Sequence, residues 1–225
     1  MQGEALHAFI RDNLPVTAVP GIPEIRLHKA VPGSGLKRLA EIDEAGLGSP
    51  YWAYHWAGGL ALARHVLDHP GIVAGKRVLD LGAGGGLVAI AATKAGAMHV
   101  TAAEIDRYAA AALRLNAALN NARIELIETD LTCGEPPNGD IVLVGDLFYA
   151  PELAEKVTAL LDRCLAKSQM VLIGDPWRAH LPMPRLREIA HYAVAETGGT
   201  AKPSGVFAWR PCPAGSVRNQ PPPNN

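Results

Sequence analysis

The feature that most constrains the fold is a glycine-rich stretch at the end of a short apolar run, Val78–Gly86. Three glycines stand there at alternate positions, namely Gly82, Gly84 and Gly86. Glycine tolerates positive φ and lets the backbone approach a ligand closely, and a helix N-terminus attracts anions. The stretch therefore predicts a strand, a tight ligand-binding turn and the start of a helix. It is not the dinucleotide fingerprint G-x-G-x-x-G, because Leu87 occupies the last glycine position.

Downstream of Lys76 the sequence alternates between segments typical of buried strands and of helices. We predict strands at residues 77–81, 99–105, 123–129, 140–147 and 169–174, and helices at residues 87–97, 106–120 and 151–167. Asp106 is the expected N-cap of the second of these helices. Repeated strand–helix units form a parallel sheet with helices on both faces. The predicted fold class is therefore α/β, with a Rossmann-like doubly wound, mostly parallel sheet.

The two ends of the chain are less regular than its centre. Before the glycine-rich stretch we predict a helix at residues 4–13, an edge strand at 24–29 and a helix at 60–67. After the last strand–helix unit we predict a short helix at 185–190 and an antiparallel hairpin of 191–196 and 206–210, joined through 198–199. The chain is accordingly divided into an N-terminal extension packed on the core, a main domain and a flexible polar tail, at residues 1–56, 57–213 and 214–225.

Composition limits the classes of protein to consider. The chain has 225 residues and 48% apolar content, enough for one domain with a large core. A net charge of -1 argues against binding nucleic acid by bulk attraction. Three scattered cysteines, Cys133, Cys164 and Cys212, indicate reduced thiols and no zinc site. No apolar stretch approaches the roughly 20 residues of a membrane helix. The first residues show no targeting pattern, so we expect a cytoplasmic protein.

Acidic residues stand at the ends of four predicted strands: Asp80, Glu104, Asp130 and Asp146. Ligands of parallel sheets bind beyond the carboxyl ends of the strands. An acid about 20 residues past a glycine loop accepts hydrogen bonds from ribose hydroxyls, which is the position of Glu104. Asp130 is placed to accept from the exocyclic amine of a purine. Taken singly, each acid is also explained as the cap of the helix that follows it.

The glycine-rich stretch and these acids together resemble the class I, or seven-stranded, S-adenosylmethionine-dependent methyltransferases. The resemblance runs from about Trp56 to Arg210. It implies seven strands, with residues 80–86 holding the amino-acid end of S-adenosylmethionine, Glu104 its ribose and Asp130 its adenine. The expected product is S-adenosylhomocysteine, and no metal is expected. The implied cofactor-binding residues are Trp56, Asp80, Gly82, Gly84, Gly86, Glu104, Asp130 and Asp146.

The tetrad D-L-F-Y at residues 146–149 ends the fourth predicted strand. It differs from the N-P-P-Y of amide and nucleobase-amine methyltransferases and resembles the D-x-x-Y of protein lysine methyltransferases. Residues 50–59 (PYWAYHWAGG) and 174–178 (GDPWR) are similar to segments of the electron transfer flavoprotein β-subunit lysine methyltransferases. That resemblance implies a protein lysine N-methyltransferase acting on this flavoprotein subunit, with Trp56 at the cofactor pocket. The family has bacterial and mitochondrial members, and the missing transit pattern favours a bacterial, cytosolic one.

In this interpretation Asp146 and Tyr149 are the catalytic residues. Asp146 would orient the substrate amine, and Tyr149, together with Phe148, would line the channel for the lysine. Only a neutral amine attacks, and deprotonating a lysine of pKa about 10.4 at pH 7 costs about 4.6 kcal/mol. A positive sulfonium and a desolvating aromatic pocket both lower that pKa. The reaction therefore needs no strong general base.

Other functions account for fewer of these residues. A methyltransferase for a ribosomal protein or a small-molecule amine shares the glycine loop, but the ribosomal-protein enzymes usually carry an asparagine where Asp146 stands. A non-catalytic partner of another methyltransferase would not need the tetrad. His65 and His69 have the spacing of a metal pair, but Val66 replaces the glutamate of H-E-x-x-H. No G-x-S-x-G elbow is present for a hydrolase. We expect a protein substrate, without nucleic acid, membrane or metal.

Overall fold

The computed structural model of the chain describes residues 3–36, 49–195 and 200–212. Its α-helices are α1 (Gly3–Asn13), α3 (Ala57–Asp68), α4 (Leu87–Lys94), α5 (Arg107–Leu119) and α6 (Pro151–Ala166). Its 3₁₀ helices are η1 (Tyr51–Ala53), η2 (Pro70–Ile72), η3 (Leu131–Cys133) and η4 (Met183–Arg185). Its strands are β1 (Val16–Val19), β2 (Ile22–His28), β3 (Arg77–Leu81), β4 (His99–Ala103), β5 (Glu125–Ile127), β6 (Ile141–Gly145), β7 (Met170–Asp175), β8 (Leu186–Ala195) and β9 (Ala201–Trp209). The tail predicted at residues 214–225 lies outside the described residues.

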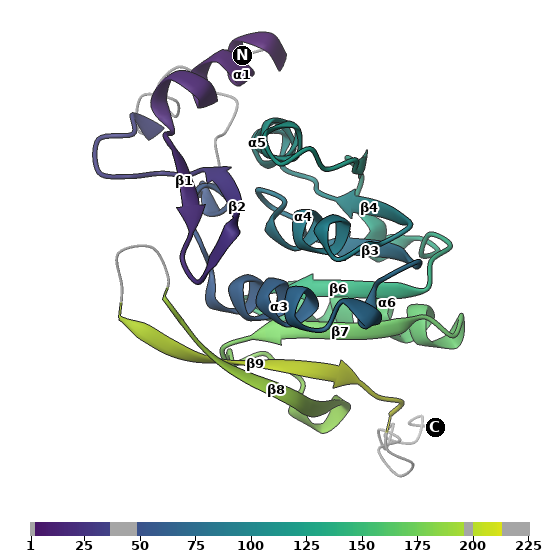
Figure 1. The fold of residues 1–225 in the computed structure, drawn as a ribbon. Helices are drawn as coiled ribbons and strands as arrows, with labels where there is room; N and C mark the ends of the chain where they lie inside the picture. The colour runs from purple at the N-terminus through teal and green to yellow at the C-terminus, as the bar shows by residue number, and fades with distance from the viewer. Residues whose placement is uncertain (1–2, 37–48, 196–199, 213–225) are drawn as a thin grey trace, which may run out of the picture.

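Seven strands form one sheet in the order β5-β4-β3-β6-β7-β9-β8 (Figure 1). The strands from β5 to β7 are all parallel, whereas β9 is antiparallel to both β7 and β8. The predicted α/β class, with a mostly parallel seven-stranded sheet and an antiparallel C-terminal hairpin, is confirmed. The chain runs outward from β3 through β4 to β5, and then returns to β6 on the other side. The switch point therefore lies between β3 and β6, where ligands of such sheets bind.

Side chains of the central strands alternate between two apolar cores. On β6, Ile141 and Leu143 belong to the core under α3, α4 and α5. Their neighbours Val142 and Val144 belong to the core under α6, on the other face of the sheet. Helices thus cover both faces, as predicted (Figure 1). Burial on both faces explains why β6 is a continuous apolar run in the sequence.

The N-terminal strands do not join the main sheet. β1 and β2 pair with each other, so the edge strand predicted at residues 24–29 is β2, in a separate two-stranded sheet. Side chains of α5 hold β2 instead. Asn116 Oδ1 accepts from the backbone N–H of His28 at 2.8 Å, and Asn120 bonds to the N–H and the carbonyl of Arg26. The N-terminal segments are therefore fixed to the helix layer.

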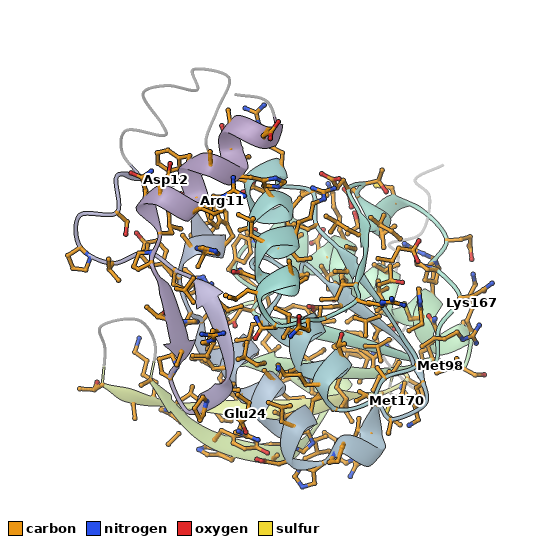
Figure 2. The ribbon with its side chains drawn as sticks, turned by 45° about the horizontal axis from the view of Figure 1, so that its top comes forward. Arg11, Asp12, Glu24, Met98, Lys167 and Met170 are labelled. Carbon is orange, nitrogen blue, oxygen red and sulfur yellow. The ribbon has the colours of Figure 1, made fainter. Side chains whose placement is uncertain are left out.

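The N-terminal segments lie at the carboxyl ends of the parallel strands. In Figure 1 the arrowheads of β6 and β7 point toward the side on which β1 and β2 lie. In Figure 2, Met98 and Met170, which stand at the amino ends of β4 and β7, lie with Lys167 on the side opposite to Arg11 and Asp12 of α1. The N-terminal segments are therefore near the edge of the sheet at which ligands bind.

The helix predicted at residues 185–190 is wrong. The prolines before it form η4, and β8 begins at Leu186. β8 then pairs with β9 from Leu186 opposite Trp209 to Ala195 opposite Ala201. Pairing along the whole strand outweighs the local sequence pattern, and the hairpin is longer than predicted. The predicted connection at residues 198–199 lies outside the described residues.

Helix α3 and strand β7 meet backbone to backbone at two glycines. A Cβ on Gly58 would lie 2.2 Å from the carbonyl oxygen of Gly174, and a Cβ on Gly174 would lie 2.1 Å from the carbonyl oxygen of Gly58. Neither position has room for a side chain. This contact brings the first turn of α3 to the ends of β6 and β7.

We expect the substitution Gly174→Ala to lower the free energy of unfolding by roughly 1–3 kcal/mol, because overpacking forces α3 away from β7. Urea denaturation followed by circular dichroism measures the change. The matched control is Gly71→Ala, where a Cβ meets no atom within 4 Å. An unfolding free energy of Gly174→Ala equal to that of the control would show that the contact is not required.

Candidate active site

A cavity of about 780 Å³ lies at the carboxyl ends of β3, β4 and β6. It contains most of the site residues predicted from the sequence: Trp56, Asp80, Gly82, Gly84, Glu104, Asp130, Asp146 and Tyr149. Gly86 is the one predicted residue that does not line it. The topology of the sheet thus gathers residues from five separate segments around one space.

The glycine loop leaves its backbone bare toward this cavity. Gly82 and Gly84 have φ of 68° and 54°, which disfavour any residue with a Cβ. A Cβ on Gly82 would also lie 2.6 Å from Leu147 Cδ2. Glu104 Oε2 accepts from the backbone N–H of Gly84 at 2.8 Å. The loop is therefore held by an acid of the neighbouring strand.

Gly86 serves the packing of the helix that follows the loop. It is the N-cap of α4, with φ of 87°. A Cβ there would lie 2.9 Å from Leu113 Cγ of α5. Position 86 therefore requires glycine, because α5 approaches it so closely.

Asp80 and Glu104 are desolvated strand-end acids. Asp80 is 2% exposed and accepts from the backbone N–H of Ala89 at 2.9 Å, in the first turn of α4. Burial raises the pKa of Asp80 to about 7. Burial also raises the pKa of Glu104, although backbone bonds from Asp106 and Gly84 oppose the rise. Both acids thus stabilise backbone turns while they line the cavity.

Asp130 is more exposed and is held in its charged form. Its carboxylate accepts from the backbone N–H and the hydroxyl of Thr132, at 2.8 and 2.7 Å, and so caps η3. These bonds lower the pKa of Asp130. Asp130 therefore caps η3 and lines the cavity at the same time.

Asp146 ties three segments together at the end of β6. Its Oδ2 accepts from the backbone N–H of Gly59 at 2.6 Å, and its Oδ1 accepts from Arg178 Nη2 at 2.7 Å. Burial raises the pKa of Asp146, and the bond from Arg178 opposes that rise. Its backbone is left-handed, with φ of 59°. The side chain is thus fixed at the edge of the cavity from both sides.

Arg178 ends the family-like segment at residues 174–178, and the sequence does not predict a role for it. Its backbone N–H donates to Oδ1 of the fully buried Asp175 at 2.7 Å. Its guanidinium lies 5.8 Å from the ring centroid of Trp56. Trp177, between these two residues of the loop, has φ of 58°. An arginine three residues after an acid that ends a buried strand is the signal that could have indicated the ion pair with Asp146.

Aromatic side chains surround the mouth of the cavity. The ring centroid of Tyr51 lies 5.9 Å from that of Tyr149 and 5.7 Å from that of Trp56. Trp56 Nε1 donates to the carbonyl oxygen of Tyr51 at 2.8 Å. Tyr149 is 52% exposed. Phe148 is fully buried in the core under α6, so the prediction that it lines a lysine channel is wrong.

Lys29 also lines the cavity, and sequence reasoning missed it. Its Nζ donates to the carbonyl oxygens of Trp52 and Tyr54, at 2.7 and 2.8 Å. Burial lowers the pKa of Lys29 to about 7. Lys29 is a single lysine at the end of the predicted edge strand, and nothing in the sequence there indicates that its side chain is buried.

The histidine pair belongs to a different part of the molecule. His65 Nδ1 lies 2.9 Å from the hydroxyl oxygen of Tyr192, and His69 Nδ1 lies 3.1 Å from the carbonyl oxygen of His65. Within residues 3–36, 49–195 and 200–212 there is no group of three side chains able to hold a metal. In the same ranges no helix has the length and hydropathy to cross a membrane.

Comparison with known proteins agrees with this geometry. A sequence profile of the ribosomal protein L11 methyltransferase (PrmA) family matches residues 62–169. The electron transfer flavoprotein beta subunit lysine methyltransferase of Xenopus laevis is 39% identical over 196 residues, which cover 84% of this chain and 79% of that protein. The human protein of that name is 38% identical over 200 residues, which cover 85% and 76%.

A solved structure supports the fold. Magnesium protoporphyrin IX methyltransferase from Synechocystis PCC 6803, with bound S-adenosylmethionine, matches with a TM-score of 0.53 at 18% identity and covers 79% of this chain and 91% of that chain. The glycine loop fits this cofactor, because Gly82, Gly84 and Gly85 line the cavity without side chains and beside Glu104. S-Adenosylmethionine is thus the cofactor of this enzyme. The chain is a class I methyltransferase and belongs to the family of electron transfer flavoprotein β-subunit lysine methyltransferases.

Proposed function

We propose that this protein methylates lysine side chains of the β subunit of electron transfer flavoprotein. The observation that carries the proposal is the position of Asp146 and Tyr149 at the mouth of the glycine-loop cavity, in a chain whose named relatives align over more than four fifths of its length. The ribosomal-protein profile covers residues 62–169, the part that includes the glycine loop. A bacterial cytoplasmic location stays a prediction, since these two relatives come from animals.

The carboxylates of the cavity suit the nucleoside of the cofactor. When bound, S-adenosylmethionine supplies an electrophilic methyl carbon on a positive sulfur. Glu104 accepts from the ribose hydroxyls and Asp130 from the adenine amine in this proposal, and the backbone of the glycine loop faces the amino-acid end. Asp80 supports the first turn of α4, which directly follows the loop, by accepting from the backbone N–H of Ala89.

Asp146 orients the substrate amine. A carboxylate has about four lone-pair sites, and the bonds from Gly58, Gly59 and Arg178 occupy three of them, so it can still accept from a lysine amine. The nearby positive charge of Arg178 disfavours the ammonium form of that lysine. Arg178 therefore holds Asp146 in position and offsets the preference of that carboxylate for the ammonium form.

The aromatic side chains at the mouth desolvate the lysine. Tyr149, Tyr51 and Trp56 present ring faces and edges along the entrance. Removal from water lowers the pKa of an amine, which favours the reactive neutral form. Ring faces also attract the cationic methylated product.

We expect Asp146→Asn to lower kcat by about 10²-fold or more, because an amide orients the amine less well and releases Arg178. The Kd of S-adenosylhomocysteine, measured by calorimetry, should stay close to that of the wild type. Asp140→Asn, at the exposed amino end of the same strand, is the control and should retain kcat. Equal losses of kcat and cofactor affinity would assign Asp146 to the cofactor site instead.

Glu104→Gln should weaken the binding of S-adenosylhomocysteine about tenfold or more, because a charged acceptor for the ribose is lost. The amide oxygen can still accept from the N–H of Gly84, whereas the bond from the N–H of Asp106 to Oε1 is lost. Glu155→Gln, on the exposed face of α6, is the matched control and should bind normally. A Kd of Glu104→Gln equal to that of the control would refute the ribose role.

The acceptor is tested by incubating the enzyme and labelled S-adenosylmethionine with an equimolar mixture of flavoprotein β subunit and ribosomal protein L11. We expect label on the flavoprotein subunit alone, and mass spectrometry of its peptides then maps the lysines. Asp146→Asn enzyme is the negative control. Label on L11 with none on the flavoprotein subunit would support the alternative acceptor and overturn the proposal.

A further inference from the structure

Lys29 is a deeply buried cation. It is 5% exposed, and no described carboxylate forms an ion pair with it. An ammonium has three donors, and the carbonyls of Trp52 and Tyr54 take two of them. A buried charge without a countercharge is costly and is retained where a ligand or partner supplies the opposite charge. The third donor and the missing countercharge thus both indicate an anion.

The ammonium lies at the glycine loop. A Cβ on Gly85 would lie only 3.3 Å from Lys29 Nζ, and both residues line the cavity. Asn116 connects the same two segments, because its Nδ2 donates to the carbonyl of Gly85 and its Oδ1 accepts from the N–H of His28, both at 2.8 Å. The end of β2 and the glycine loop are therefore fixed relative to each other, with Lys29 between them.

The other basic residues of the cavity have other neighbours in the structure. Arg178 pairs with Asp146, and Lys156 extends from α6, where its charge acts on Asp130. His55 is neutral, because burial and then the charge of Lys29 lower its pKa to about 3. Among the described cavity residues, Lys29 is thus the cation left for an anion at the glycine loop.

The cofactor carries one anionic group, the carboxylate of its amino-acid end. We infer that the ammonium of Lys29 binds this carboxylate, so that the segment after β2 forms part of the cofactor site. The carboxylate supplies both an acceptor for the third donor and the missing countercharge. The inference depends on the cofactor and not on the protein acceptor proposed above.

The test compares two ligands that differ in one group. Calorimetry measures the Kd of S-adenosylmethionine and of decarboxylated S-adenosylmethionine for the full chain and for Lys29→Met. We expect the wild type to prefer the carboxylated ligand by about tenfold or more. Lys29→Met should lose that preference through weaker binding of S-adenosylmethionine, with the Kd of the decarboxylated ligand unchanged. Lys76→Met, which removes a lysine bonded to a backbone carbonyl outside the cavity, should keep the wild-type preference.

A purely structural role for Lys29 predicts a different result. Its loss would then weaken both ligands by the same factor, and that outcome would overturn the inference. If Lys29→Met does not fold, Lys29→Gln, which keeps a hydrogen-bond donor, replaces it. Equal Kd values of the two ligands for the wild type would overturn the inference without any variant. None of these measurements uses a protein acceptor, so failure of the flavoprotein proposal would leave their result unaffected.

Discussion

The site depends on carboxylates that end parallel strands and accept hydrogen bonds from backbone amides of the next segments. Asp80 holds the first turn of α4, Glu104 holds the glycine loop, and Asp146 holds the first turn of α3. Each of these amides would otherwise lack a partner at a loop or a helix start. Because the acids are also desolvated, their bonds are strong and their positions are fixed. The same atoms that fold the loops therefore shape the space for the cofactor.

The central part of the fold is predictable because its signals are local. Parallel strands buried on both faces are apolar runs, and the helices between them carry apolar stripes and caps, as Asp106 shows by accepting from the N–H of Tyr108. The N-terminal sheet and β8 depend on partners far along the chain. β2 is fixed by side chains of α5, and the pairing of β8 with β9 decides its structure. Neither partner can be inferred from the segment itself.

The acids of the candidate site were predictable for a similar reason. The carboxyl ends of parallel strands lie at one edge of the sheet, where ligands bind. An acid at the end of a predicted strand is therefore a candidate site residue even before its contacts are known. Lys29 and Arg178 gave no comparable signal. The carbonyls that hold Lys29 come from the segment around η1, and the partner of Arg178 stands 32 residues before it. Phe148, which turns into the core, shows that a motif does not fix the direction of each of its side chains.

Two non-glycine residues with left-handed backbones, Asp146 and Trp177, stand just beyond the ends of the adjacent strands β6 and β7. A left-handed conformation costs a residue with a Cβ roughly 1–2 kcal/mol. Glycine at position 146 would relieve that cost but would remove a carboxylate from the cavity, whereas glycine at position 177 would remove an indole that packs against His191 and Phe207. Selection for heat resistance and selection for turnover consequently oppose each other at the codon of Asp146, and thermophilic versions of such an enzyme must gain their stability elsewhere in the chain.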